Sequence, residues 1–183
     1  MRYALRGTGE GLYLFYAIGN SYCIKRENTG ILYEKRKELR MRREDIQMLR
    51  DIQKNAELGM KAVDTAADKV YDDGLALQIS RQSLKYSELR NRAADRLLAA
   101  HLEPARSNVV EGALVAGGIY GETLFDTSTS HIAEVIIQES SKKISKLCQS
   151  LHKYENACDA AVEIAQEFMD FEENNIRQLR KFL

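Results

Sequence analysis

One feature of the sequence constrains the fold more than any other. From about residue 44, apolar side chains recur at intervals of three and four residues, which is the period of an amphipathic helix. The 183 residues include a single proline, Pro104, so few positions interrupt that period. The pattern therefore predicts an all-α fold built from long helices.

Four apolar stripes predict four main helices. The first two stripes contain Ile46, Leu49, Gln53, Ala56, Met60, Val63, Ala67 and Val70, and then Leu75, Ile79, Gln82, Tyr86, Leu89, Ala93 and Leu97. The last two contain Ile132, Ile136, Ser140, Ile144, Leu147 and Leu151, and then Ala161, Ala165, Phe168, Glu172, Ile176, Leu179 and Leu183. Turn residues near 71–74 and 154–156 separate neighbouring stripes by only a few positions, which predicts antiparallel pairs in a four-helix bundle.

A shorter helix is expected between the two pairs, over about residues 105–125. Its predicted inward stripe consists of Ala113, Gly117 and Gly121, small residues that let two helix backbones approach closely. Glu111 and Glu122 flank a short apolar stretch, so the pattern favours tight packing on the bundle over membrane insertion.

The first 40 residues differ from the rest in glycine content and in hydrophobic periodicity. They carry 5 of the 11 glycines and no sustained helical period. The codons for Arg36-Lys37-Glu38, just ahead of Met41, would match a purine-rich ribosome-binding sequence. Residues 1–40 are therefore interpreted as an N-terminal extension upstream of a natural start at Met41, or alternatively as a loosely attached arm. Residues 41–183 are the predicted bundle domain.

Charge and composition exclude several classes of protein. The formal net charge is zero, and residues 41–183 carry a net charge of −4, which argues against a nucleic-acid-binding surface. Cys23, Cys148 and Cys158 lack metal-site or disulfide-scaffold spacing. The apolar run at 12–18 is too short to span a bilayer and lacks a signal-peptide cleavage site. A cytoplasmic protein without a membrane span is expected.

Three blocks of the sequence resemble a known group of proteins. They are LRDIQKNAELGM at 49–60, SHIAEVIIQ at 130–138 and FEENNI at 171–176. Through these blocks, residues 44–183 resemble uncharacterised ferritin-like four-helix-bundle proteins of anaerobic spore-forming bacteria. The resemblance implies a ferritin-like antiparallel four-helix bundle with one additional short helix. It implies no reaction, because none is assigned to that group.

A ferritin-type metal centre is the first candidate site. Such a centre needs a Glu from each of two helices and a Glu-x-x-His from each of the other two. The sequence has no Glu-x-x-His and one reversed pair, His131-x-x-Glu134. As an alternative, His131 and Glu134 together with Glu172 are candidate ligands of a non-standard site for iron or manganese. Capping or surface hydrogen bonding is the favoured role of His131 and Glu134.

A buried polar layer is the second candidate. Gln53, Gln82 and Glu172 fall on inward positions, where each needs a hydrogen-bond partner, and Gln138 or Glu139 could join them. A structural layer is favoured over a metal site because amides are poor iron ligands. No catalytic residue or cofactor is predicted. The expected function is that of a non-enzymatic bundle acting through protein contacts or self-association, and the alternative is a metal-binding protein.

Overall fold

The computed structural model describes residues 4–8, 11–18, 21–26, 41–106 and 109–183. The chain divides into two compact units, residues 1–41 and residues 42–183. The boundary falls where the glycine-rich sequence gives way to the helical period.

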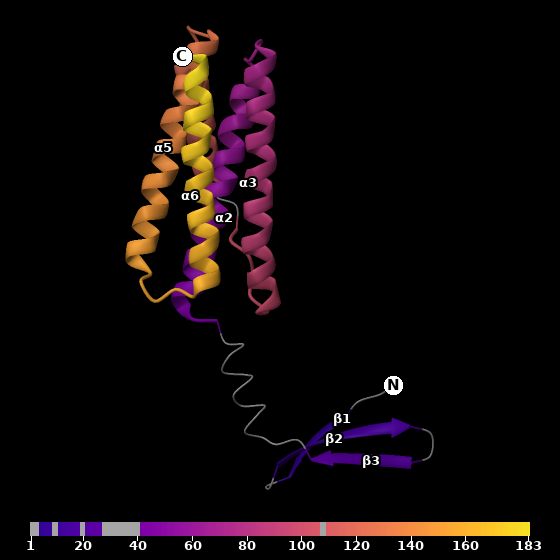
Figure 1. The fold of residues 1–183 in the computed structure, drawn as a ribbon. Helices are drawn as coiled ribbons and strands as arrows, with labels where there is room; N and C mark the ends of the chain where they lie inside the picture. Colours follow the sequence, from indigo (N-terminus) through magenta and orange to yellow (C-terminus); the bar gives the residue numbers. More distant parts are fainter. Residues whose placement is uncertain (1–3, 9–10, 19–20, 27–40, 107–108) are drawn as a thin grey trace. The chain divides into compact units, whose positions relative to one another are not determined.

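The N-terminal unit contains a three-stranded antiparallel sheet (Figure 1). Its strands are β1 (Ala4–Thr8), β2 (Gly11–Ile18) and β3 (Ser21–Arg26), in the order β1-β2-β3. Phe15 of β2 pairs with Ala4 on one side and with Ile24 on the other. Aromatic and β-branched residues are abundant in this stretch and favour strands. The sheet differs from the all-α expectation for the chain, since the absence of a helical period before Met41 predicted no strands.

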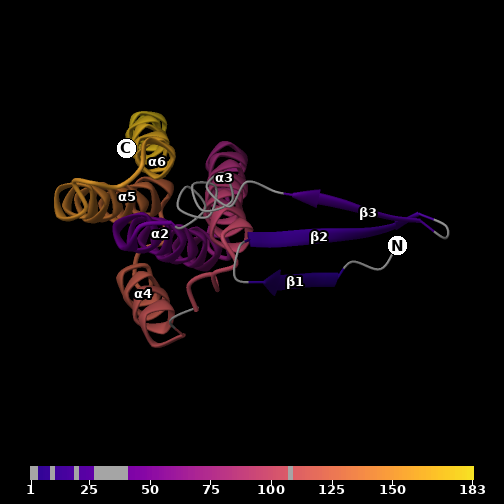
Figure 2. The same cartoon turned by 90° about the horizontal axis from the view of Figure 1, so that it is seen from below.

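Residues 42–183 contain only helices among the positions described. The helices are α2 (Arg43–Ala67), α3 (Asp73–Ala99), α4 (Val109–Glu122), α5 (Thr129–Lys153) and α6 (Asp159–Leu179), followed by a 3₁₀ turn, η1 (Arg180–Phe182). Helices α2, α3, α5 and α6 lie side by side as a bundle, and α4 lies outside it against α2 (Figures 1 and 2). The all-α prediction is confirmed for this unit. No described helix combines the length and apolar character needed to cross a membrane.

The short helix α4 connects α3 to α5 along the side of α2. Near its start, the Ala105 amide donates to Gln53 Oε1 in the first half of α2, and at its end Lys69 donates to Thr123 beyond the last turn of α2. Helix α4 therefore runs parallel to α2. Helix α3 follows α2 after a short turn and runs antiparallel to it, so the chain crosses the bundle through α4 before α5 begins.

Helix α5 runs antiparallel to α2. Near the end of α5, Ser150 Oγ donates to Asp51 Oδ2 in the first half of α2 at 2.8 Å. At the α5–α6 turn, the Cys158 amide donates to Asp45 Oδ1, which also lies at the start of α2. Since α6 reverses direction after that turn, α2 and α6 run one way and α3 and α5 run the other.

Helices α3 and α5 begin at polar residues whose side chains cap the first turn. Asp72 accepts from the Leu75 amide at the start of α3, and Ser128 accepts from the His131 amide at the start of α5. At the end of α3, His101 adopts a left-handed conformation with φ of 58°. Its amide donates to Leu98 O while the next amide donates to Leu97 O, which is the Schellman arrangement.

The predicted stripe of α3 is confirmed in full, since its seven residues are the buried ones. The other stripes are confirmed in part. Helix α2 is buried over a wider arc than predicted, because it contacts all four other helices, while its predicted inward residue Ala67 is exposed. On α5 and α6, Lys143 and Asn175 are buried although the apolar pattern did not include them.

The predicted inward stripe of α4 is wrong. Ala113, Gly117 and Gly121 are exposed, and a Cβ added at either glycine would meet nothing within 4 Å. Ile119, on the opposite side of the helix, is the residue that packs into the bundle. The small residues therefore face outward, because α4 is held by that opposite side.

Candidate functional sites

A buried carboxylate, Glu172, is the centre of the polar cluster inside the bundle. Its side chain is fully buried on α6 and accepts from Tyr86 Oη of α3, at 2.9 Å to Oε1 and 3.1 Å to Oε2. The Nζ atom of Lys143, on α5, lies 3.6 Å from Oε1. Three helices therefore supply one negative group, one positive group and one hydroxyl to the same buried place.

Amide groups extend this cluster along α3 and α6. Asn175 Nδ2 donates to Glu172 Oε2 at 3.4 Å, and Gln78 Nε2 donates to Asn175 Oδ1 at 3.3 Å. Gln82 is also fully buried, but its side-chain polar atoms lack a hydrogen bond of ordinary geometry to any residue that the structure describes. The hydroxyl of the fully buried Ser140 lies close enough to Glu172 and Tyr86 to act toward a lower pKa of each. Unpaired polar groups in a core are costly, so Gln82 is the least well satisfied of these buried amides.

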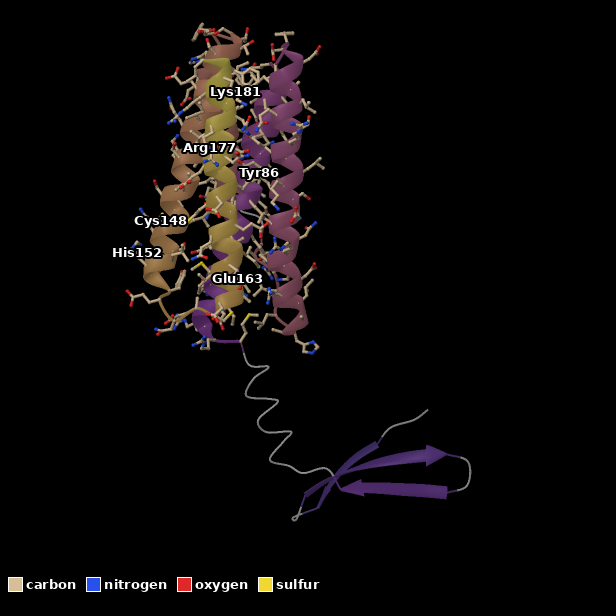
Figure 3. All side chains as sticks on the ribbon, viewed as in Figure 1. Tyr86, Cys148, His152, Glu163, Arg177 and Lys181 are labelled. Carbon is tan, nitrogen blue, oxygen red and sulfur yellow. The ribbon has the colours of Figure 1, made fainter. Side chains whose placement is uncertain are left out.

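The Tyr86 ring is fixed by close packing on all sides. Its centroid lies 5.8 Å from that of Phe168 and 5.3 Å from that of Phe171, with the second pair edge to face. Lys143 Nζ lies 5.4 Å from the ring centroid, in a cation–π contact. On α2, Gly59 leaves room for the ring, since a Cβ there would lie 2.9 Å from two ring atoms. Figure 3 shows Tyr86 midway along the bundle.

Burial moves each ionisable group of the cluster toward its neutral form. Desolvation raises the pKa of Glu172, although the Lys143 charge and hydrogen bonds, including that from Tyr86, act in the opposite direction. Desolvation likewise lowers the pKa of Lys143, against the attraction of Glu172 and Glu139. The pKa of Tyr86 is raised well above its ordinary value by desolvation and by the Glu172 charge. The ion pair is therefore held against a large cost of burial.

The three residues of the predicted polar layer do not form hydrogen bonds with one another in the structure. Gln53, Gln82 and Glu172 are all buried. However, Gln53 Oε1 accepts from the Ala105 amide at 2.8 Å, so this side chain ties the α3–α4 connection to α2 and does not meet Glu172. Of the two further candidates, Gln138 is exposed, and Glu139 is paired with Lys142 at 2.7 Å.

The candidate metal ligands are not brought together either. His131 Nε2 lies 3.0 Å from Glu122 O, and its Nδ1 atom lies 3.9 Å from the largely exposed Glu134. Glu172 lies beside Lys143, twelve residues further along α5, a helical rise of about 18 Å. Among the described residues, no three His, Cys, Asp or Glu side chains converge on a point that could hold a metal ion. The pattern His131-x-x-Glu134 describes a helix start.

Sequence reasoning missed Lys143 and Tyr86 as members of the buried cluster. Tyr86 was assigned to an apolar stripe, although its hydroxyl required a partner. Lys143 follows Lys142 in a charged stretch, so the apolar period gave no sign that it is buried. A lone inward Glu172 was the available signal, because a buried carboxylate needs a cation close by.

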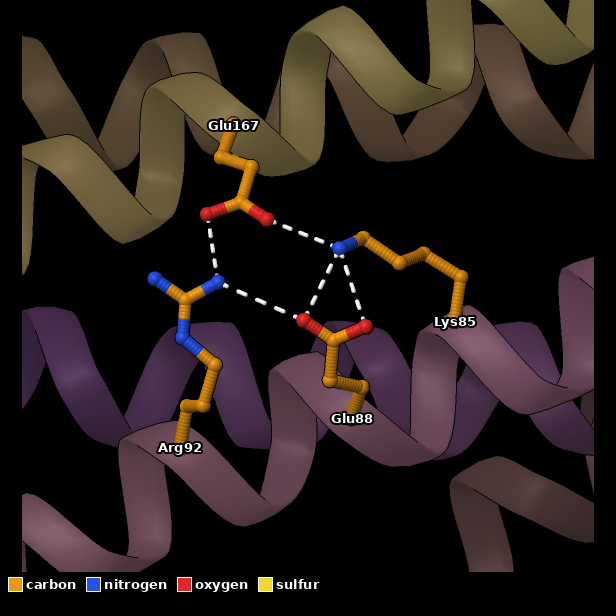
Figure 4. A network of polar contacts seen from close by, with 4 residues as sticks. All are labelled: Lys85, Glu88, Arg92 and Glu167. Carbon is orange, nitrogen blue, oxygen red and sulfur yellow. Dashed lines mark hydrogen bonds and ion pairs between the residues drawn. The ribbon is translucent and has the colours of Figure 1, made fainter.

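A second polar network links α3 to α6 at the surface. Lys85 Nζ lies 2.8 Å from Glu167 Oε1 and 2.9 Å from Glu88 Oε1, and Arg92 pairs with both carboxylates (Figure 4). These side chains are 27–50% exposed, so solvent screens each pair. We interpret this network as a set of surface ion pairs that links the two helices.

The outer side of α4 gathers more than half of the exposed large apolar side chains among the residues that the structure describes. Six large apolar side chains on α4 and just beyond its end are 51–95% exposed: Val109, Val110, Leu114, Tyr120, Leu124 and Phe125. We call these six residues, with the exposed Ala113, Gly117 and Gly121 between them, the α4 face. The charged residues of α4 itself are Glu111 and Glu122, which lie outside this set.

Comparisons with known proteins do not extend this description. No family model matches the chain, and no curated protein or solved structure matches it significantly. The resemblance to ferritin-like proteins therefore stays a hypothesis based on the sequence.

The raised pKa of Glu172 predicts how this residue contributes to stability at different pH. A carboxyl group whose pKa is higher in the folded than in the unfolded state binds a proton more tightly when folded, so its contribution is present at low pH. That contribution is lost as pH rises past the ordinary value of 4.5 and through the raised pKa. The free energy of unfolding of the wild type, relative to that of Glu172→Gln, should therefore fall as pH rises from about 4 to neutrality.

Urea titrations across this pH range measure the difference. Glu173→Gln changes an exposed neighbouring carboxylate on the same helix and serves as the control. This variant controls for the removal of one carboxyl group from α6. A constant difference for Glu172→Gln would contradict the direction assigned to the Glu172 pKa.

Proposed function

We propose that this protein is a non-enzymatic, ferritin-like helical bundle that acts through protein contacts made by the α4 face. The observation that carries the proposal is the exposure of six large apolar side chains on one helix and the residues next to it. Exposed apolar surface is unfavourable in water, and large contiguous patches mark interaction sites. The ferritin-like assignment is supported by the single crossover connection, which is a feature of ferritin-like bundles.

The size of the α4 face suits a protein partner. A large apolar side chain presents on the order of 150–200 Å² when fully exposed, so the six residues at their exposed fractions present roughly 700 Å². The largest apolar patch on a typical monomer covers roughly 300–600 Å². A standard protein interface covers about 800 Å² on each partner, which is close to the area of the α4 face.

The buried cluster supports a structural role over a catalytic one. Its ionisable groups, Glu172, Tyr86 and Lys143, have pKa values shifted by burial and lie between three helices, and Glu172 and Tyr86 have no exposed area. A catalytic group must reach a substrate atom. We assign the cluster to fixing how the helices align, which is an attested use of buried polar groups in bundles.

Photocrosslinking in the organism that makes the protein tests the proposed contact. A photoreactive amino acid at Leu114 should form discrete adducts with protein, because this side chain is central on the α4 face and 70% exposed. The matched control is Leu84, which is 73% exposed on α3 and outside the face. Equal adducts at the two positions, or none at either, would refute a contact made by α4.

Elemental analysis tests the metal-binding alternative. Protein purified without a nickel affinity resin is expected to contain iron, manganese or zinc far below one atom per chain. Our reason is that Glu172 is already paired with Lys143 and that the candidate ligands lie apart. A stoichiometric metal would replace the present proposal with a metal-binding function.

A further inference from the structure

The partner of the α4 face can be specified from its shape and charge. We propose that it is the α4 face of a second copy of this chain, with the two helices antiparallel across a twofold axis at Gly117. This inference rests on the proposed function, because it names the partner of the same surface. Three properties carry it, namely the symmetry of the face, the absence of Lys and Arg from α4, and the area of the face.

The face is self-complementary about Gly117. In an antiparallel pair centred there, residue 113 of one copy meets residue 121 of the other, and residue 110 meets residue 124. Small residues thus face small ones, Ala113 against Gly121, and branched ones face each other, Val110 against Leu124. Residue 114 meets residue 120, which sets a leucine against a tyrosine ring. The same surface can therefore serve both sides of a twofold interface.

The glycines of the face leave space for a partner. A Cβ at Gly117 or Gly121 would meet nothing within 4 Å, so neither glycine is required by the packing of its own chain. In a helix, glycine is less stable than alanine by about 1 kcal/mol. Glycine on an exposed helix surface is explained when another backbone approaches it closely.

The charges of α4 oppose a membrane as the occupant. A helix that lies on an anionic membrane carries Lys and Arg beside its apolar face. Helix α4 contains neither of these residues, and its two charged residues are Glu111 and Glu122. Glu111 pairs with Lys146 of α5 at 3.4 Å, so the carboxylate of Glu122 is the one that an anionic membrane would repel. The nearby Lys69 is engaged by Tyr120 O and by Thr123 Oγ1, and its Nζ atom lies 3.9 Å from the Tyr120 ring centroid.

The area of the face meets the need of a twofold pair. Complete burial of roughly 700 Å² of apolar side chain per copy would cover about 1,400 Å² in total, which lies in the standard range for stable interfaces of about 1,200–2,000 Å². Twofold dimers are also the commonest closed assemblies of identical chains.

Measurement of the mass of the full chain in solution tests the pairing. Light scattering after size exclusion, from about 1 µM to 1 mM, should give twice the mass of one chain at the upper concentrations. Gly117→Glu places two carboxylates opposite each other at the axis and should give the mass of one chain throughout. Gly117 has open space around it, so this variant should keep the helical circular dichroism of the wild type.

The matched control is Leu84→Glu, which adds the same charge at an exposed apolar position on α3 and should leave the dimer intact. A wild-type chain that stays monomeric to 1 mM would overturn the inference. So would a Gly117→Glu variant that stays dimeric. In either event, a crosslink from Leu114 to a different protein would leave the proposed function standing.

Cysteine crosslinking tests the direction of the two helices. In a chain whose Cys23, Cys148 and Cys158 are replaced by serine, Gly117→Cys should form an intermolecular disulfide across the axis under mild oxidation. Val110→Cys alone should not, because its partner in the antiparallel pair is residue 124. Efficient disulfides at both 110 and 117 would indicate a parallel pair and contradict the proposed geometry.

Discussion

Lys143→Met is expected to lower the free energy of unfolding by about 3 kcal/mol at neutral pH. The substitution keeps a long unbranched side chain and removes the ammonium group that lies 3.6 Å from Glu172. A buried carboxylate left without its cation typically costs about 3–5 kcal/mol. The lower end is expected because Glu172, whose pKa is already raised by burial, can take up a proton. Urea unfolding at pH 7 measures the loss.

The neighbouring lysine provides the control for this change. Lys142→Met removes a cation whose side chain is 60% exposed and pairs with Glu139 on the surface. Exposed pairs of this kind contribute about 0–1 kcal/mol, so little should be lost. Adding Glu172→Gln to Lys143→Met should recover part of the loss, because no charge is then buried. Similar small losses for both lysine variants would show that the buried pair does not matter to stability.

The helices and most of the core could be predicted from the sequence because both follow from a local pattern. A stripe of apolar residues at helical spacing identifies the buried side of a helix that has one packed face. Helix α3 is such a helix, and its seven predicted residues are the buried ones. Helix α2 has neighbours on several sides, so a single stripe underestimated what it buries.

The site could be predicted less well because its members are not related by local spacing. Glu172 was recognised as an inward carboxylate, but its partners Tyr86 and Lys143 come from two other helices, 86 and 29 residues away. The orientation of α4 also depended on the tertiary fold. Its sequence offers apolar or small residues on nearly every side, and only the packing of Ile119 shows which side faces inward.

Gly59→Ala is expected to destabilise the protein by up to about 2 kcal/mol, although alanine is the better helix former. The added Cβ would lie 2.9 Å from Cε1 and Cζ of Tyr86. The ring cannot move aside easily, because it is fully buried, packs against Phe168 and Phe171, and is held through its hydroxyl by Glu172. Overpacking a core by one methyl group costs about 1–3 kcal/mol, and the gain in helix propensity offsets about 1 kcal/mol of it.

The substitution Gly117→Ala separates the gain in helix propensity from the cost of overpacking the core. An added Cβ meets nothing within 4 Å there, so Gly117→Ala should stabilise the monomer by up to about 1 kcal/mol, measured at low protein concentration.

Replacing Tyr86 tests whether its ring causes the cost of Gly59→Ala. In a Tyr86→Leu background the ring is absent, so Gly59→Ala should lose most of its cost, which gives a coupling energy between positions 59 and 86 of about 1 kcal/mol or more. A Gly59→Ala variant as stable as Gly117→Ala would show that the ring moves freely. Glu172 would then not be fixing Tyr86 between the helices, and the cluster would lose its assigned role in their alignment.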